Sequence, residues 1–171
     1  MWCCAILPDD INSLIKQICT EANRDIGLPM DVFRFPLHIS MKKSFRTSDF
    51  DSVKRQLRDC LERHGKMDIK VSAPVRNGRM IWLKVEKTES LMSLHEEMDR
   101  LLLERFAIPI SEHDALFLPH ISLFTGGDRE KLDKMYGILE KKIEGFEPEV
   151  TRFVIGSSAH RDEYFDIRGM K

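Results

Sequence analysis

The tripeptide His-Ile-Ser occurs twice in this chain, at positions 38–40 and 120–122. Each copy lies in a short apolar run, 36–41 and 118–123, as is typical of a buried β-strand. Successive side chains of a strand point to opposite faces. Each His therefore shares a face with its Ser, ~7 Å away, while the Ile between them points into the core. Two such strands facing each other would place two imidazoles and two hydroxyls around one cleft.

The elements around the two tripeptides follow the same order. The pattern predicts a helix, a loop, the His-Ile-Ser strand, a helix and two strands, and then the same series again. The tripeptides lie 82 positions apart, close to half of the 171 residues. We therefore expect an α+β fold of two pseudo-twofold-related lobes. Each lobe would be an antiparallel sheet with helices on its outer face, and the active-site cleft would lie between them.

The whole chain, 1–171, is expected to form a single bilobal domain, because no linker is long enough to separate independent domains. Its two repeats would span approximately 1–85 and 79–171. Asp9 is expected to cap the first helix, whose apolar face would be Ile11, Leu14, Ile15, Ile18 and Ala22. A turn is predicted at 74–78, between strands at 67–73 and 79–85.

Composition limits the possible partners. The hydrophobic content of 42% supports a full core, and the net charge of -1 gives no basic field to attract long nucleic acid. A nucleic-acid substrate would therefore be short, or the protein would bind only an RNA end.

The four cysteines form no Cys-x-x-Cys pair and are expected to be idle thiols in a reducing compartment. The first ten residues lack a basic leader and a long apolar stretch, so we expect a cytoplasmic protein with no membrane span. We also expect a monomer.

The remaining histidines carry weaker signals. His95 precedes two glutamates, but Asp99 occupies the position where a zinc-protease helix needs its second His. His113 and His160 fall in predicted loops, where either could line the cleft, although exposure to solvent is the expected role. No carboxylate cluster accompanies the two tripeptides, so we expect neither a metal site nor a cofactor.

With its two His-Ile-Ser strands in two halves of a small α+β chain, the sequence resembles the two-histidine (2H) phosphoesterase superfamily. The resemblance is closest to the 2'-5' RNA ligase-like and RNA 2',3'-cyclic phosphodiesterase branch, and it covers nearly the whole chain. Ser stands at both positions where that branch usually has Thr. The resemblance implies metal-independent hydrolysis of a 2',3'-cyclic phosphate or a 2'-5' phosphodiester, in RNA ends or in small nucleotides.

The residues themselves permit this chemistry. Imidazole can be acid or base near neutrality, so His38 and His120 can share proton transfer on opposite sides of a phosphorus, with either one as the base. Ser40 and Ser122 would donate hydrogen bonds to the phosphate oxygens. The alternation of side chains extends the site to Lys42, as a possible phosphate contact, and to Phe124, as a possible base-stacking ring. Trp82 is a third candidate for substrate binding.

Two alternatives remain open at this point. The same cleft could belong to a non-catalytic module that binds RNA ends or nucleotides. The chain could also be a scaffold without a site, in which both histidines satisfy hydrogen bonds of the core. Turnover distinguishes the first alternative, and the effect of His substitutions on stability distinguishes the second.

Overall fold

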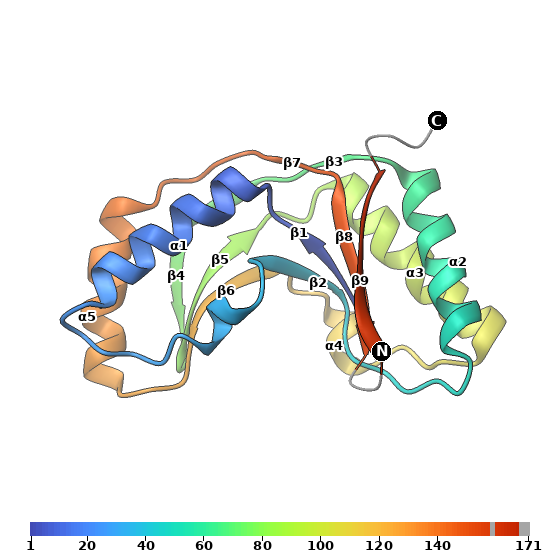
Figure 1. Cartoon of the computed structure of the whole chain (residues 1–171), viewed down its shortest axis with the longest axis horizontal. Coiled ribbons are helices and arrows are strands. Elements are labelled where there is room, and N and C mark those ends of the chain that lie inside the picture. Colours follow the sequence, from blue (N-terminus) through green and yellow to red (C-terminus); the bar gives the residue numbers. More distant parts are fainter. Residues whose placement is uncertain (158–159, 168–171) are drawn as a thin grey trace.

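A computed structural model describes residues 1–157 and 160–167 and shows an α+β fold with two lobes (Figure 1). One sheet is antiparallel with the strand order β2-β1-β8-β9. Its strands are β1 (Trp2–Ile6), β2 (His38–Lys42), β8 (Arg152–Ser157) and β9 (His160–Asp166). Helices α2 (Phe50–His64) and α3 (Glu89–Phe106) pack together on its outer side. We call this unit the four-stranded lobe.

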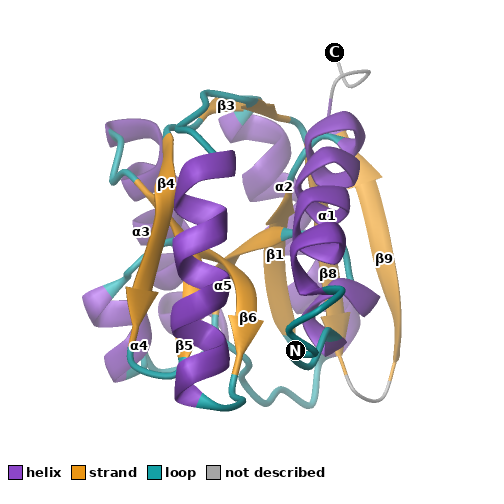
Figure 2. Cartoon of the chain, turned by 90° about the vertical axis from the view of Figure 1, so that its left-hand side faces the viewer, coloured by secondary structure: helices purple, strands orange, loops and turns teal. Residues whose placement is uncertain are grey.

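The second sheet is antiparallel with the order β4-β5-β6. Its strands are β4 (Val71–Asn77), β5 (Met80–Val85) and β6 (His120–Thr125). Helices α1 (Asp9–Asn23) and α5 (Arg129–Lys142) lie side by side on its outer side (Figure 2). We call this unit the three-stranded lobe. The short elements are the 3-10 helix η1 (Asp31–Arg34), helix α4 (Glu112–Leu116), and the paired strands β3 (Met67–Asp68) and β7 (Glu149–Val150).

Each sheet takes strands from both halves of the chain. Strand β1 lies between β2 and β8, and β5 lies between β6 and β4, so the two sheets share the same inner arrangement. The two lobes therefore do not correspond to the two halves of the sequence. The motif strands β2 and β6 occupy equivalent places beside β1 and β5, and they contact each other between the lobes.

Three local predictions are wrong. Asp9 does not cap α1, because it is the first residue of the helix and the N-cap is Pro8, which makes no side-chain hydrogen bond. The predicted turn at 74–78 lies within β4 except for its last residue, and the hairpin turns at Gly78 and Arg79. Pro74 is tolerated because β4 is an edge strand with a register irregularity before this residue. Leu14, expected on the apolar face of α1, is 57% exposed. Asn23 is buried in its helix instead, where its amide exchanges two hydrogen bonds with the backbone of Leu28.

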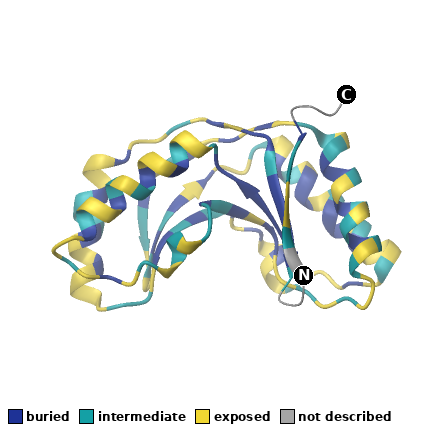
Figure 3. Cartoon of the chain, in the orientation of Figure 1, coloured by how far each residue is buried: buried dark blue, intermediate teal, exposed yellow. Residues whose placement is uncertain are grey.

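Helix α2, unlike α1, begins with a side-chain cap. Asp49 caps α2 by accepting a hydrogen bond from the backbone N–H of Ser52. All four cysteines are buried and free. Within residues 1–157 and 160–167, no helix has the length and apolar character needed to cross a bilayer. Buried positions follow the strands and the inner faces of the helices, as Figure 3 shows.

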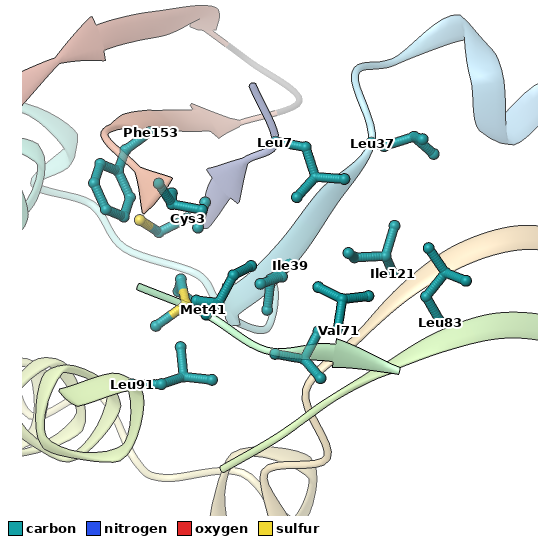
Figure 4. Close-up of a cluster of buried hydrophobic side chains, with 14 of the residues drawn as sticks. Cys3, Leu7, Leu37, Ile39, Met41, Val71, Leu83, Leu91, Ile121 and Phe153 are labelled. Carbon is teal, nitrogen blue, oxygen red and sulfur yellow. The ribbon is translucent and has the colours of Figure 1, made fainter. Parts of the chain in front are cut away.

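The middle residues of both tripeptides are core residues. Ile39 and Ile121 are fully buried in one apolar cluster that spans both lobes (Figure 4). Ile39→Ala and Ile121→Ala should each lower the free energy of unfolding by ~2–5 kcal/mol, because each leaves a cavity in packed surroundings. Urea denaturation measures this change. Ile110→Ala is the matched control, since Ile110 is 44% exposed; a cost at Ile110 as large as at Ile39 would contradict the assignment.

Candidate active site

The two histidines of the repeated tripeptide line one pocket of about 740 Å³. His38 is the first residue of β2 and His120 is the first residue of β6. The Nδ1 atom of His38 lies 2.8 Å from the carbonyl oxygen of Pro36, and that of His120 lies 2.8 Å from the carbonyl oxygen of Leu118. A carbonyl only accepts, so Nδ1 carries the proton in both rings. Nε2 is then the nitrogen left for proton transfer.

The environment of His38 favours its neutral form. Burial lowers the pKa of His38 below the ordinary value of a histidine, the hydrogen bond to the Pro36 carbonyl opposes this shift, and the nearby charge of His120 adds to it. His120 lines the same pocket, which is why its charge acts on the His38 ring. A neutral imidazole with a free Nε2 can accept a proton.

The lowered pKa of His38 predicts an effect of pH on stability. The unfolded chain binds a proton at His38 near pH ~6.5, while the folded chain binds it only at lower pH. The contribution of this residue is therefore complete above pH ~6.5 and is lost as the pH falls toward the folded pKa. His38→Gln removes the titrating group. As the pH falls, the free energy of unfolding of the variant should therefore decrease less than that of the original protein. Urea denaturation between pH 8 and pH 5 tests this, and a constant difference at every pH would contradict it.

The serines of the tripeptides lie on the same faces as their histidines. Ser40 is exposed and lines the pocket, opposite Cys4 in the pairing of β1 with β2. Ser122 is partly exposed and lies opposite Trp82, but it is not among the residues that line the pocket. Burial raises the pKa of the Cys4 thiol to about 12, so this sulfur is a neutral wall of the pocket rather than a nucleophile.

A β-bulge follows the serine in both motif strands. In β2, Ser40 pairs with Cys4 and Lys42 pairs with Cys3, which leaves Met41 as an extra residue. In β6, Ser122 pairs with Trp82 and Phe124 pairs with Ile81, which leaves Leu123 as an extra residue. The residue after each bulge is thereby shifted out of simple alternation with the His and the Ser.

The bulges overturn the expected role of Phe124 and change that of Lys42. Phe124 is fully buried and its ring meets that of Phe33 edge to face, so no substrate base can stack on it. Lys42 contributes to the pocket wall but is only 1% exposed. Its Nζ lies 2.5 Å from a carboxylate oxygen of Asp99 and 2.9 Å from one of Asp114. Its charge is therefore neutralised within the protein and is not offered to a phosphate.

The ion pair of Lys42 anchors helix α4 to the motif strand. Asp114, on α4, also accepts hydrogen bonds from the Ser111 hydroxyl and from the backbone N–H of Lys43. Burial alone would raise the pKa of Asp114, but the hydrogen bonds from Lys42, Ser111 and Lys43 lower it overall. Buried His95 on α3 adds contacts from Nδ1 to the Met41 carbonyl and from Nε2 to the Asp114 carbonyl.

Trp82 lies where the sequence predicted a substrate-binding ring. It lines the pocket, and its ring centroid is 4.1 Å from that of His120. The His38 side has its own aromatic contact, because the Phe35 ring meets the His38 ring edge to face at 5.1 Å. Trp2 packs edge to face on Phe35 and also lines the pocket. Aromatic rings therefore flank both histidines.

Helix α4 and the residues after it supply a wall that the sequence analysis did not predict. His113 is exposed, as expected, but it belongs to α4 and lines the pocket. Leu116, Phe117 and Leu118 line it as well. Leu116 and Leu118 are 66% and 63% exposed, so they give this wall an apolar surface that faces solvent. The side chain of His160 lies outside the described part of the structure.

The sequence of the chain matches the 2'-5' RNA ligase superfamily over residues 7–162. The chain belongs to this superfamily. A Bacillus licheniformis protein named "Putative phosphoesterase" is 27% identical over 125 residues, which cover 69% of each sequence. A Bacillus cereus protein of the same name is 31% identical over 126 residues, which cover 69% of this chain and 68% of that protein.

Solved structures of other proteins share this α+β fold. TT0787 of Thermus thermophilus has a TM-score of 0.62 and 16% sequence identity, over 99% of this chain and 98% of the other. Escherichia coli LigT, solved with 3'-AMP, has a TM-score of 0.60 and 15% identity, over 96% of this chain and 92% of LigT. The superfamily assignment and these relatives identify the chain as an enzyme of the 2H phosphoesterase type.

In residues 1–157 and 160–167, no group of three or more His, Cys, Asp or Glu side chains is arranged to hold a metal ion. The acidic side chain that reaches the pocket of this 2H phosphoesterase is Asp114, and it is engaged by Lys42. Among the described residues, the groups at the pocket suited to proton transfer near neutral pH are the imidazoles of His38, His120 and His113.

Proposed function

We propose that this protein is a phosphodiesterase that hydrolyses a 2',3'-cyclic phosphate or a 2'-5' phosphodiester by two-histidine acid/base catalysis. Its substrates would be RNA ends or small nucleotides. One observation carries the proposal: His38 and His120 line one pocket, and each is held by a backbone carbonyl at Nδ1, which leaves Nε2 for the substrate. The LigT structures with 3'-AMP and with NADP+ support a nucleotide as the ligand class.

In the proposed reaction, one neutral imidazole takes a proton from water through Nε2 while the water oxygen bonds to phosphorus. The protonated imidazole on the other side gives its proton to the departing ribose oxygen as the P–O bond breaks. For a cyclic phosphate the product is a phosphomonoester on the 2' or 3' oxygen. The lowered pKa of His38 favours it as the base, which leaves His120 as the acid.

The serines would stabilise the charge that develops on the phosphate oxygens. Ser40→Ala and Ser122→Ala should each cost ~1–3 kcal/mol of transition-state stabilisation, by removing one hydrogen bond to a charged oxygen. Because Ser40 lines the pocket and Ser122 does not, the larger loss is expected at Ser40. The ratio of kcat/KM between the original protein and each variant measures the loss, and equal activity in both variants would remove the serines from the mechanism.

The deciding experiment is a substrate panel. RNA oligonucleotides with 2',3'-cyclic ends, 2'-5'-linked dinucleotides, cyclic mononucleotides and ADP-ribose cyclic phosphate are incubated with the protein, with and without EDTA. We expect turnover of at least one member, at a rate that the chelator leaves unchanged. Activity lost in EDTA and restored by Mg²⁺, Mn²⁺ or Zn²⁺ would count against the two-histidine mechanism. Binding of a nucleoside monophosphate without turnover of any member would favour the non-catalytic module.

The proposal extends to the organisation of the chain. We propose that residues 1–171 act as one monomeric bilobal domain built from two repeats. The equivalent places of β2 and β6 in their sheets, and the bulge that follows Ser40 and Ser122, support the repeats. The apolar cluster that spans both lobes supports a single unit.

A further inference from the structure

A second pocket, of about 590 Å³, adjoins the first on the side of His120. Trp82, Leu118 and His120 line both pockets, so the two pockets adjoin at these residues. The far part is lined by Pro119 and by residues from the ends of β4 and β5. A substrate held at His120 therefore has room to extend beyond the reacting phosphodiester on this side.

The second pocket combines an apolar wall with positive charge. Trp82, Val85, Leu118 and Pro119 supply the apolar surface. Lys84 and Lys87 supply two cations, against one carboxylate from Glu86. A sugar or a base packs on apolar and aromatic side chains, and a phosphate pairs with lysine, so this combination fits a nucleotide.

Lys84 is placed for a phosphate next to the reacting one. It lies directly opposite His120 in the pairing of β5 with β6, so the two side chains leave the sheet on one face ~5 Å apart. Its side chain is exposed, and within the described residues it forms no ion pair. Lys87 differs, because its Nζ donates to the carbonyl oxygen of Leu116 at the end of α4. Lys42, the other lysine near a motif histidine, is buried between two carboxylates.

We propose that this second pocket binds the nucleotide unit adjacent to the scissile phosphodiester, with Lys84 contacting the phosphate of that unit. The proposal rests on the proposed function, and it specifies the substrate class as an oligonucleotide rather than a mononucleotide. The sugar or base of the added unit packs against Trp82, Leu118 and Pro119. Lys87 adds positive charge at the rim.

The test compares substrates that differ only in length. Cytidine 2',3'-cyclic phosphate is compared with di- and tetranucleotides that end in the same cyclic group. The original protein should show a kcat/KM for the dinucleotide ~10-fold above that for the mononucleotide, as expected for one hydrogen bond to a charged phosphate. Lys84→Ala should reduce the ratio of kcat/KM for the dinucleotide to kcat/KM for the mononucleotide to about 1, whatever the rate on the mononucleotide itself. Lys84→Arg should keep most of the gain.

Lys134→Ala is the matched control, because Lys134 is a surface lysine of α5 paired with Glu130, away from both pockets. It makes the same change in net charge and should leave the gain intact. Equal kcat/KM for the mononucleotide and the longer substrates, or a gain that survives Lys84→Ala, would overturn the proposal. Both of these results would leave the proposed hydrolysis standing.

A second measurement covers the case in which no member of the series is hydrolysed, which would refute the proposed function. Binding of a tetranucleotide with a 3'-phosphate is then measured at several salt concentrations. A single-stranded phosphate contact contributes a slope of ~0.7 to the dependence of log K on log salt. Lys84→Ala should reduce the slope by about this amount relative to Lys134→Ala. An unchanged slope would overturn the second pocket as a nucleotide site.

Discussion

His38→Ala and His120→Ala should each lower the phosphodiesterase rate by ~10² or more, because each removes one positioned acid or base. The double variant should be little worse than either single variant, since the two imidazoles act as a unit. His64→Ala is the matched control: His64 ends α2, contacts Ser90 and is not a lining residue of the pocket. Steady-state kinetics on the substrate that the panel identifies provides the measurement.

The same variants test the division of roles between the two rings. The pH–rate profile of the original protein should be bell-shaped, with an acidic limb from the base and an alkaline limb from the acid. The lowered pKa of His38 assigns the acidic limb to this residue, so His38→Ala should lose that limb in its residual activity. His120→Ala should lose the alkaline limb. Loss of the opposite limbs would exchange the two roles.

Stability must be followed in parallel. His38 and His120 are partly exposed at the pocket, whereas Ile39 and Ile121 are fully buried between them and their serines. The His variants should therefore keep most of their free energy of unfolding, while the Ile variants lose it. If the histidine variants unfold while the isoleucine variants stay stable, the histidines face the core and the isoleucines face the pocket. The imidazoles would then be structural.

The sequence allowed a better prediction of which residues meet at the pocket than of how the strands pair. His38, Ser40 and His120 could be placed at the pocket because period-two alternation holds over the short stretch from each His to its Ser. Trp82 could be placed there by the alternation of side chains along β5. Relative to the predicted units, strands β4 and β5 join the sheet of β6, and strands β8 and β9 join the sheet of β2. This exchange could not be predicted, because strand pairing depends on contacts between distant parts of the chain and not on local pattern.

The bulges mark the limit of the alternation rule. A rule of period two cannot anticipate one extra residue in a strand. For Phe124 a signal existed, since Leu123 and Phe124 are adjacent apolar residues and both are buried. For Lys42 the local sequence contains no such signal. Its partners Asp99 and Asp114 come from α3 and α4, and only the fold brings them to β2.

Lys42→Met should lower the free energy of unfolding by ~3–5 kcal/mol, the cost of leaving a buried carboxylate without its partner. Lys42 is 1% exposed, and the side chains of Asp99 and Asp114 are 8% and 6% exposed, so water cannot replace the lost ammonium. Urea denaturation measures the loss. Lys66→Met is the control, because the ion pair of Lys66 with Glu149 lies at the surface and its removal should change stability far less.

A rescue experiment separates charge from packing. Adding Asp99→Asn and Asp114→Asn to Lys42→Met removes both orphaned charges and should recover a large part of the lost stability, since the cost arises from unpaired charge. No recovery would show that Lys42 acts through its hydrogen-bond geometry or its packing.

Lys42→Met should also raise KM more than it lowers kcat. Asp114 holds α4 against the pocket, and α4 and the residue after it supply the lining residues His113, Leu116 and Phe117. A fall in kcat alone, at unchanged KM, would instead place the effect of Lys42 on the strand that carries His38.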